Sequence, residues 1–113
     1  LMAAIGPHET TITRVQQQVL EQLDQTFTVE SLARMASMSP RHFARVFAQE
    51  VGMTPMAFIQ SVRIDHARQL LETSDLPLKT VAFKSGFGSV RYMRFLFNER
   101  LGLTPAQYRE QFS

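Results

Sequence analysis

The sequence predicts an all-α fold in which a short two-helix module occurs twice and a long helix joins the copies. Residues 31–63 and 80–112 repeat one another, apolar residues recur at helical spacing, and Ser-Pro or Thr-Pro pairs mark helix starts. Self-similarity at a fixed period indicates a duplicated supersecondary unit. We therefore expect seven helices, no strand and two helix-turn-helix units.

The two copies stay in register over most of their length. From Ser39 and Ser89 onward they align at a constant offset of 50, and before that the offset is 49. One residue has therefore been added to the second copy, in the turn at Gly86-Phe87-Gly88. The matched residues include Phe47 with Phe97, Gly52 with Gly102, Thr54-Pro55 with Thr104-Pro105, and Phe58 with Tyr108.

Each helix of the first half has a start or stop signal. The first is expected from Thr10 to about Asp24, because its apolar residues recur every three or four positions. Thr28 caps a short second helix. Ser39-Pro40 begins the third, since Ser is a strong N-cap and Pro is tolerated at the first helical position, and Gly52 ends it.

The fourth helix is the longest, from Thr54-Pro55 to about Thr73. Its apolar residues spread over more than half of its circumference, so it must be covered on more than one side. We therefore expect it to pack against both halves and to fix their relative orientation. These apolar residues are Phe58, Ile59, Val62, Ile64, Ala67, Leu70 and Leu71.

The second half repeats the order after a break at Asp75-Leu76-Pro77. Its helices are expected from Lys79 or Thr80 to Ser85, from Ser89 to about Arg100, and from Thr104-Pro105 onward. The chain is thus divided into a linker or expression remnant at 1–9, a first unit at 10–55, a connector helix at 56–74 and a second unit at 75–113. Because it opens at Leu1 rather than Met, we expect it to be part of a longer protein.

Basic residues form two blocks although the net charge is only +2. No acidic residue interrupts either block, and the blocks fall at repeat-related positions. A short basic run is usually a solvated face, but its recurrence favours a surface that faces phosphates. The blocks contain Arg34, Arg41 and Arg45 between Glu30 and Glu50, and Lys79, Lys84, Arg91 and Arg94 between Asp75 and Glu99.

Composition excludes several classes of function. The absence of cysteine excludes zinc-finger and thiol chemistry and fits a reducing compartment, so we expect a cytoplasmic protein. No apolar run has membrane-spanning length, and nothing resembles a secretory signal. His8, His42 and His66 lack metal-ligand spacing, so no metal or cofactor is expected. No nucleophile–base pair or phosphate-cradling glycine loop indicates an enzyme.

The helix from Ser39 presents a basic side opposite an apolar one. Phe43, Val46 and Phe47 fall on the apolar side. The other side carries Arg41, Ala44, Arg45 and Ala48, spaced as on one helical face. Small alanines allow close approach to a groove floor, and arginine can pair with guanine O6 and N7 through two hydrogen bonds. This is the layout of a recognition helix.

The helix from Ser89 has a similar division. Met93, Leu96 and Phe97 face inward, whereas Arg91, Arg94, Phe95 and Asn98 face outward. An exposed Phe95 could press on a thymine methyl group or pack against a missing domain or partner. Asn98 could read adenine or simply cap the helix end.

A further set of side chains is expected to contact phosphates. Ser39, Thr54 and Ser89 begin helices whose N–H groups and dipoles favour anions, although plain capping is the alternative. His42 and Tyr92 occupy equivalent flanking positions in the two recognition helices. The basic candidates in this set are Arg63, Lys79 and Lys84.

These motifs resemble the DNA-binding domain of AraC/XylS-type bacterial transcriptional regulators over about residues 10–112. The resemblance rests on LAxxAxMSxRxFxRxF from Leu32, GMTPxxF from Gly52, RxxxAxxLL from Arg63, VAxxxGFGS from Val81 and FxxxLGLTPxxYR from Phe97. The GFGS motif and the LLETSDLPL junction look most like the subgroup in which this domain follows a PfpI-like, amidotransferase-like domain.

The resemblance implies two homeodomain-like helix-turn-helix units and one monomer across two successive major grooves. The implied base-reading positions are Arg41, Ala44 and Arg45 in the first recognition helix and Val90, Arg91, Arg94 and Phe95 in the second. The family usually carries Arg at position 95. We therefore expect the second half to be the weaker reader, held mainly by phosphate contacts.

The predicted function is sequence-specific binding of double-stranded DNA by a bacterial transcription regulator. RNA polymerase is the expected protein partner, and effector binding or dimerisation would use a missing N-terminal domain. The alternative is a protein-interaction module whose arginine faces engage an acidic partner such as a polymerase subunit. No membrane partner is expected.

Overall fold

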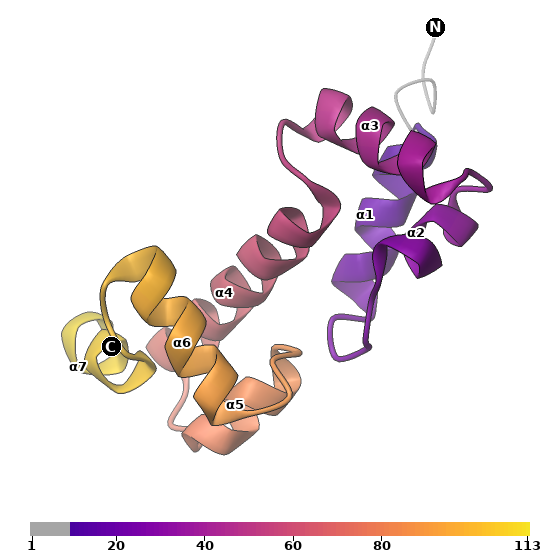
Figure 1. Cartoon of the computed structure of the whole chain (residues 1–113). Coiled ribbons are helices and arrows are strands. Elements are labelled where there is room, and N and C mark those ends of the chain that lie inside the picture. The colour runs from indigo at the N-terminus through magenta and orange to yellow at the C-terminus, as the bar shows by residue number, and fades with distance from the viewer. Residues whose placement is uncertain (1–9) are drawn as a thin grey trace, which may run out of the picture. The chain divides into compact units, whose positions relative to one another are not determined.

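The computed structural model describes residues 10–113, which form seven α-helices and no strand (Figure 1). The helices are α1 Thr11–Glu21, α2 Val29–Met35, α3 Pro40–Val51, α4 Pro55–Thr73, α5 Leu78–Lys84, α6 Val90–Leu101 and α7 Pro105–Phe112. The expected all-α fold is confirmed. The linker expected at residues 1–9 lies outside the described residues. No helix within 10–113 is long and apolar enough to cross a membrane.

Helix starts follow the local sequence signals. The side chains of Thr10, Thr28, Ser39, Ser89 and Thr104 each accept a hydrogen bond from the backbone N–H three residues later. These caps satisfy N–H groups that have no partner inside the helix. The expected boundaries are therefore right to within a few residues.

The largest boundary difference is the end of α1, which stops at Glu21 rather than Asp24. The N–H of Gln22 closes the helix on the carbonyls of Gln18 and Val19. Leu23, which follows, is buried. Leu23 thus lies in a core although it is outside the helix, and helical periodicity alone does not distinguish these two cases.

The contacts divide the chain into two compact units. Unit 1 comprises residues 10–22 and 27–59 of the described chain, and unit 2 comprises 23–26 and 60–113. The division falls inside α4, so this helix contributes to both units. That α4 also sets their relative orientation stays a prediction.

Unit 1 has a core built by its three helices and the start of α4, and α2 packs directly on α3. The ring centroids of Phe43 and Phe47 lie 5.6 Å apart, and Phe58 meets Phe47 edge-on at 5.6 Å. Such tilted and edge-on pairs are favourable aromatic geometry. The buried apolar residues are Ile12, Val15, Val19, Leu32, Ala33, Ala36, Phe43, Phe47 and Ile59.

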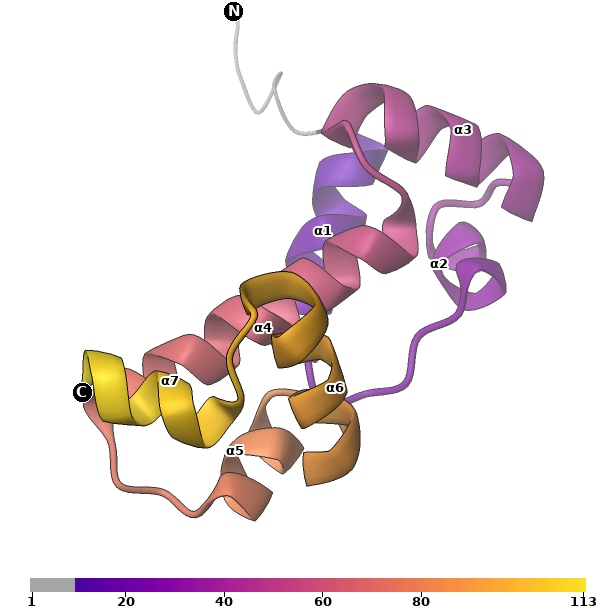
Figure 2. The ribbon, with the colours of Figure 1, turned by 60° about the vertical axis from the view of Figure 1, so that its left-hand side comes forward.

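Unit 2 has a second core around Phe97, which contacts both Phe87 and Tyr108 edge-on. Figure 2 shows α5 and α6 joined by a turn, with α7 at the chain end. The buried residues of this core are Ile64, Ala67, Leu71, Val81, Ala82, Phe87, Met93, Leu96, Phe97 and Tyr108.

The α2–α3 turn closes α2 with two backbone hydrogen bonds. The N–H of Met38 donates to the carbonyl of Ala33 at 3.0 Å, and that of Ser37 donates to Arg34 at 3.1 Å. Ser37 has a φ of +56°, in the left-handed region. This is the Schellman pattern of helix termination.

The α5–α6 turn uses the same pattern at the matching residues. The N–H of Phe87 donates to Ala82 at 2.9 Å, and that of Gly86 donates to Phe83 at 3.1 Å. Gly86 has a φ of +85°, and the added residue, Gly88, also has a positive φ of +79°. The extra residue thus enters the second turn after the helix has been closed.

Candidate nucleic-acid interface

The outer face of α3 has the expected arrangement. Phe43 and Phe47 are fully buried, which seats the opposite side of the helix on the core. Arg41 and Arg45 are exposed, and Ala44 between them is partly buried. The two arginines lie four residues apart on one helical face. The face therefore presents two exposed guanidinium groups beside the small side chain of Ala44.

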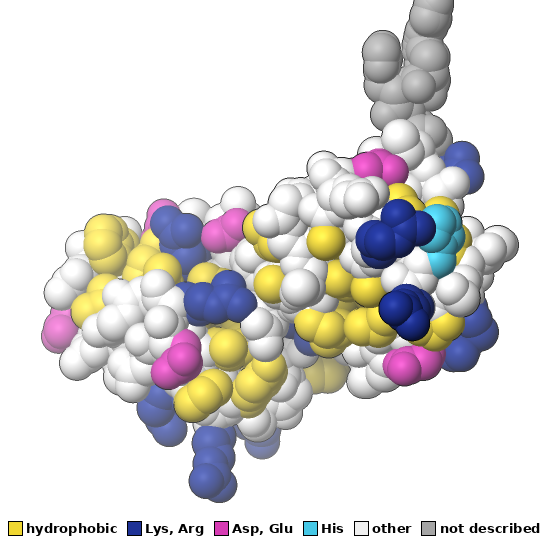
Figure 3. Space-filling model, turned by 45° about the horizontal axis from the view of Figure 1, so that its top comes forward, with side chains coloured by type: hydrophobic (Ala, Val, Ile, Leu, Met, Phe, Trp, Pro, Cys, Tyr) yellow, Lys and Arg dark blue, Asp and Glu magenta, His cyan; other side chains and the backbone are white. Residues whose placement is uncertain are grey.

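One hydrogen bond organises this face. A guanidinium nitrogen of Arg45, Nη2, lies 2.8 Å from Nδ1 of His42. Both side chains are exposed, and they are three residues apart on the helix. On the face presented in Figure 3, a histidine side chain is visible with basic side chains next to it. His42 therefore contacts a neighbouring arginine as well as solvent.

The outer face of α6 is basic at one end and aromatic at the centre. Met93, Leu96 and Phe97 are buried, as expected, whereas Arg91 and Arg94 are exposed. The exposed fraction of Phe95 is 57%, so its ring is not part of the core. The outward orientation expected for Phe95 is thus confirmed, and its replacement need not disturb the core.

Val90, the first residue of α6, is placed differently from the other candidates on that helix. It is half-buried and packs against the core of unit 2. Part of its surface is therefore already covered by protein. This placement leaves less of Val90 for a base contact than the exposed position of Arg91 does.

The serine and threonine candidates for phosphate contacts are all engaged as helix caps. The Oγ of Ser39 accepts from the N–H of His42 at 3.2 Å, and Ser89 accepts from Tyr92 at 3.1 Å. Thr54 accepts from the N–H of Ala57 at 3.1 Å. A capping oxygen retains its own O–H proton as a donor. These residues can thus cap a helix and donate to a phosphate at once.

Tyr92 belongs to a chain of contacts in unit 2. Its ring meets Phe87 edge-on, with centroids 6.0 Å apart, and its hydroxyl accepts from Nε2 of Gln60 at 3.3 Å. Arg100 in turn donates to Oε1 of Gln60 at 2.6 Å. Because Arg100 can only donate, it fixes the orientation of the Gln60 amide. The Tyr92 hydroxyl is thus supported from α4, which the sequence pattern did not reveal.

The placement of Arg63 argues against its expected phosphate contact. Its Nη2 donates to the backbone carbonyls of Leu23 at 3.3 Å and Gln25 at 2.6 Å, and the side chain is half-buried. Desolvation lowers the pKa of Arg63, although the nearby Tyr92 acts in the opposite direction. A sequence signal existed, because Arg63 is four residues from buried Ile59 and Ala67 and so falls on an inward face.

The remaining basic candidates lie on α5. Lys79 and Lys84 are exposed, and Phe83 beside Lys84 has an exposed fraction of 67%. The buried Ser85 ends this helix, and its Oγ lies 3.0 Å from Nδ1 of His66. Burial and the charge of Lys84 lower the pKa of His66. The pair thus joins α4 to the residue that follows Lys84 at the end of α5.

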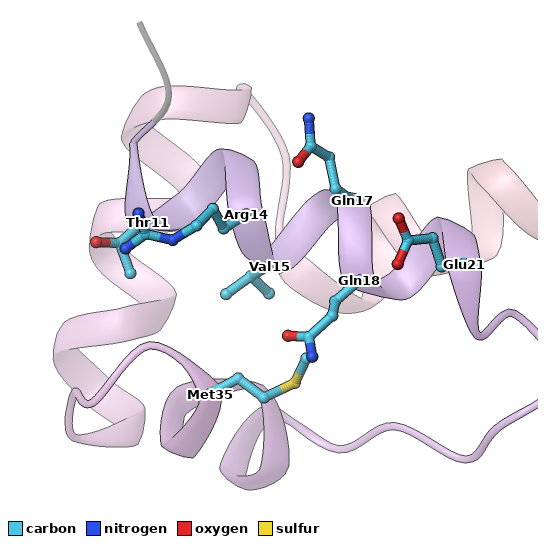
Figure 4. Close-up of a pocket in the computed structure, with 7 residues that line it drawn as sticks. All are labelled: Thr11, Arg14, Val15, Gln17, Gln18, Glu21 and Met35. Carbon is cyan, nitrogen blue, oxygen red and sulfur yellow. The ribbon is translucent and has the colours of Figure 1, made fainter. Parts of the chain in front are cut away.

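A surface pocket of about 350 Å³ lies between α1 and α2. Figure 4 shows polar side chains of α1 around its opening, with Met35 of α2 on the opposite side. It is lined by Thr11, Arg14, Val15, Gln17, Gln18, Glu21 and Met35.

Residues 10–113 contain no cluster of His, Cys, Asp and Glu able to hold a metal ion.

The chain matches a known family and several curated proteins. A family described as a helix-turn-helix domain matches residues 32–111. The HTH-type transcriptional regulator Rv1931c of Mycobacterium tuberculosis is 41% identical over 75% of this chain and 33% of its own length. The RCS-specific HTH-type transcriptional activator RclR of Escherichia coli is 37% identical over 84% of this chain and 34% of its own. The chain spans about a third of the length of these relatives.

Solved structures show the same fold. The DNA-binding domain of AdpA, described as a global transcriptional factor and solved in complex with a target DNA, has a TM-score of 0.86. It is 38% identical, and the match covers 90% of this chain and 92% of that one. The C-terminal domain of AraT, a response regulator from Geobacillus stearothermophilus, is 27% identical, with a TM-score of 0.84 and coverage of 89% and 84%. The chain belongs to the family of AraC-type helix-turn-helix DNA-binding domains.

Proposed function

We propose that this chain binds double-stranded DNA sequence-specifically as the DNA-binding part of a bacterial transcription regulator. In this proposal α3 and α6 enter successive major grooves of one duplex. The observation that carries it is the recurrence, at matched positions of two repeats, of a helix buried on one side and arginine-bearing on the other. The AdpA domain in complex with DNA supports the same use of the fold.

Base reading is assigned first to α3. Arg41 and Arg45 are exposed at a spacing of four residues and can each pair with guanine O6 and N7. Ala44 leaves room for the helix to approach the groove floor. In α6, Arg91 and Arg94 take the equivalent role, Phe95 offers an apolar contact for a thymine methyl group, and Val90 contributes its uncovered surface.

Phosphate contacts are assigned to residues around these helices. The capping hydroxyls keep a donor, and the lysines of α5 are exposed cations. Such contacts position the protein without reading bases. The proposed set comprises Ser39, Thr54, Lys79, Lys84, Ser89 and Tyr92. Arg63 is omitted because backbone carbonyls hold its guanidinium, and His42 is omitted because its Nδ1 is bonded to Arg45.

The regulator as a whole is proposed to have parts beyond this chain. An N-terminal domain would bind an effector or form a dimer, and the GFGS motif and Asp75-Leu76-Pro77 junction favour a PfpI-like one. RNA polymerase is the proposed protein partner, because transcriptional activators such as RclR are among the relatives. A cytoplasmic location is proposed because the curated relatives are transcriptional regulators.

The salt dependence of binding tests the proposal. Contacts with several phosphates release counterions, so raising salt from about 50 to about 200 mM should weaken binding on the order of a hundredfold. Selection of bound sequences from a genomic or random pool should return a split site with two half-sites. A flat salt response, with no sequence enrichment, would favour a protein partner instead.

Variants of the two recognition helices separate their roles. Arg41→Ala and Arg45→Ala should relax specificity in one half-site, each costing about 1–3 kcal/mol, and Arg91→Ala should act only in the other. Glu110→Ala is the control, since Glu110 is an exposed residue of α7 outside the proposed interface. Uniform weakening on every sequence would reassign these arginines to phosphates.

A further inference from the structure

The hydrogen bond between Arg45 and His42 constrains the state of the imidazole. A guanidinium has only donors, so Nδ1 of His42 must be the acceptor at 2.8 Å. An imidazolium has no acceptor nitrogen. The bond therefore requires a neutral His42 with its proton on Nε2.

The same bond restrains a long and flexible side chain. Within residues 10–113, Arg45 forms no ion pair with a carboxylate, since the pair found there joins Arg68 to Asp65. An arginine side chain carries considerable rotamer entropy, and a restraint made before binding reduces the entropy lost on binding.

The second unit does not reproduce this contact. Tyr92 matches His42, and Phe95 matches Arg45, so no donor–acceptor pair is possible between them. Tyr92 instead contacts Phe87 and Gln60. The restraint is thus a property of α3 alone.

We propose that His42 is a positioning residue for Arg45 and helps to determine which base pairs α3 prefers. It holds the guanidinium on the outer face of α3 only while the imidazole is neutral. The inference rests on the proposed base reading by Arg45. It differs from a phosphate contact by His42, because positioning affects discrimination between sequences whereas a phosphate contact strengthens binding to all of them.

The experiment compares the affinity for a selected duplex with that for a duplex altered in the α3 half-site. The ratio of the two affinities is the specificity ratio. His42→Ala should lower it about three- to tenfold, as expected for loss of preorganisation at one contact. His42→Gln should retain most of it, because the Gln carbonyl offers an acceptor. Melting temperatures should stay unchanged, since position 42 is exposed.

A double-mutant cycle assigns the effect to the pair. His42→Ala should have no effect on the specificity ratio in an Arg45→Ala background, because its partner is gone. In an Arg41→Ala background it should keep its full effect, which makes Arg41 the matched control. An effect that persists without Arg45 would overturn the proposal.

Binding to the two duplexes separates the positioning role from a phosphate contact. His42→Ala should weaken binding to the selected duplex more than binding to the altered duplex. If it weakened binding to both duplexes equally, His42 would be a phosphate contact and the proposal would be wrong. If Arg45→Ala left the specificity ratio unaltered, the base-reading assignment of Arg45 would fail as well, a separate result.

Discussion

The two helix-turn-helix units share one backbone plan but differ in what their turns touch. Ser37 and Gly86 occupy matching positions, and both adopt a positive φ. A Cβ on Gly86 would overlap the carbonyl oxygen of Leu23 and lie 2.6 Å from Nε of Arg63. Ser37 carries a side chain at its position and is exposed. The same turn is therefore a surface feature in unit 1 and a packed contact in unit 2.

The two recognition helices also differ, in the residues on their outer faces. In α3 the exposed face carries the Arg45–His42 bond, whereas in α6 the matching residues are Phe95 and Tyr92. In unit 2 the corresponding hydrogen bond runs between helices, because Gln60 of α4 donates to the Tyr92 hydroxyl of α6. The two copies of the module thus keep one fold, although the polar contact of the first lies on the outer face of α3 and those of the second lie in its packing.

Replacing Gly86 by Ala should have the largest effect on stability. We expect the free energy of unfolding to fall by about 3 kcal/mol or more, because the strain of a left-handed alanine is added to a clash with the backbone of Leu23. Gly88→Ala, which meets nothing within 4 Å, should cost about 1 kcal/mol from strain alone. Chemical denaturation measures both. Equal losses for the two variants would show that the packed contact has no energetic weight.

Ser37→Gly is the corresponding control in unit 1. Relief of left-handed strain and the greater entropy of unfolded glycine oppose each other, so the change in stability should stay below about 1 kcal/mol. A larger effect would mean that the first turn is as constrained as the second.

Arg63→Ala should have the next largest effect on stability. It removes charged hydrogen bonds to the carbonyls of Leu23 and Gln25, which should cost about 2 kcal/mol. The salt slope of DNA binding should not change, because no phosphate contact is lost. Lys84→Ala is the matched control, since it should leave stability unaltered and reduce the salt slope by about one. A reduced slope for Arg63→Ala would restore its phosphate role.

Exchanging residues 45 and 95 sharpens the comparison of the recognition helices. Phe95→Arg should tighten DNA binding on the order of tenfold at low salt and create a guanine preference in the second half-site. Because the Phe95 ring is exposed, the melting temperature should change little. Arg45→Phe should relax the first half-site in return. Marked destabilisation by Phe95→Arg, without tighter binding, would contradict the groove-facing assignment.

The smallest expected effect is a pH dependence confined to unit 2. Burial and Lys84 lower the pKa of His66 in the folded state, so the unfolded state binds its proton first as pH falls. The stability contributed by neutral His66 is therefore complete above its ordinary pKa of about 6.5 and declines as pH falls through the lower folded value. Denaturation at neutral and acidic pH should reveal this decline in wild type.

The matched variant isolates that effect from other titrating groups. His66→Asn keeps a polar atom near Ser85 but does not titrate in this range, so its stability should depend less on pH. Unit 1 has Ala36 at the position of Ser85 and cannot form the pair. Identical pH profiles for wild type and His66→Asn would show that His66 does not cause the pH dependence of stability.

Local sequence determined the helices and the faces of the recognition helices. Ser39-Pro40 and Gly52 bound α3 because an N-cap, a fixed proline φ and a left-handed glycine act over a few residues. The 3.6-residue period separated Phe43 and Phe47 from Arg41, and the same reasoning placed Phe95 outward. These features depend on neighbours in the chain, so the sequence predicted them directly.

Only the tertiary structure decided which polar groups serve packing. Arg63 meets carbonyls about 40 residues away, and Gln60 joins Tyr92 and Arg100 across similar separations. Gly86 is needed because Leu23 leaves α1 and approaches the second turn. A residue's type and helical phase give the direction of its side chain but not the backbone that it meets. Those contacts arise from packing between distant segments, which periodicity along one helix does not encode.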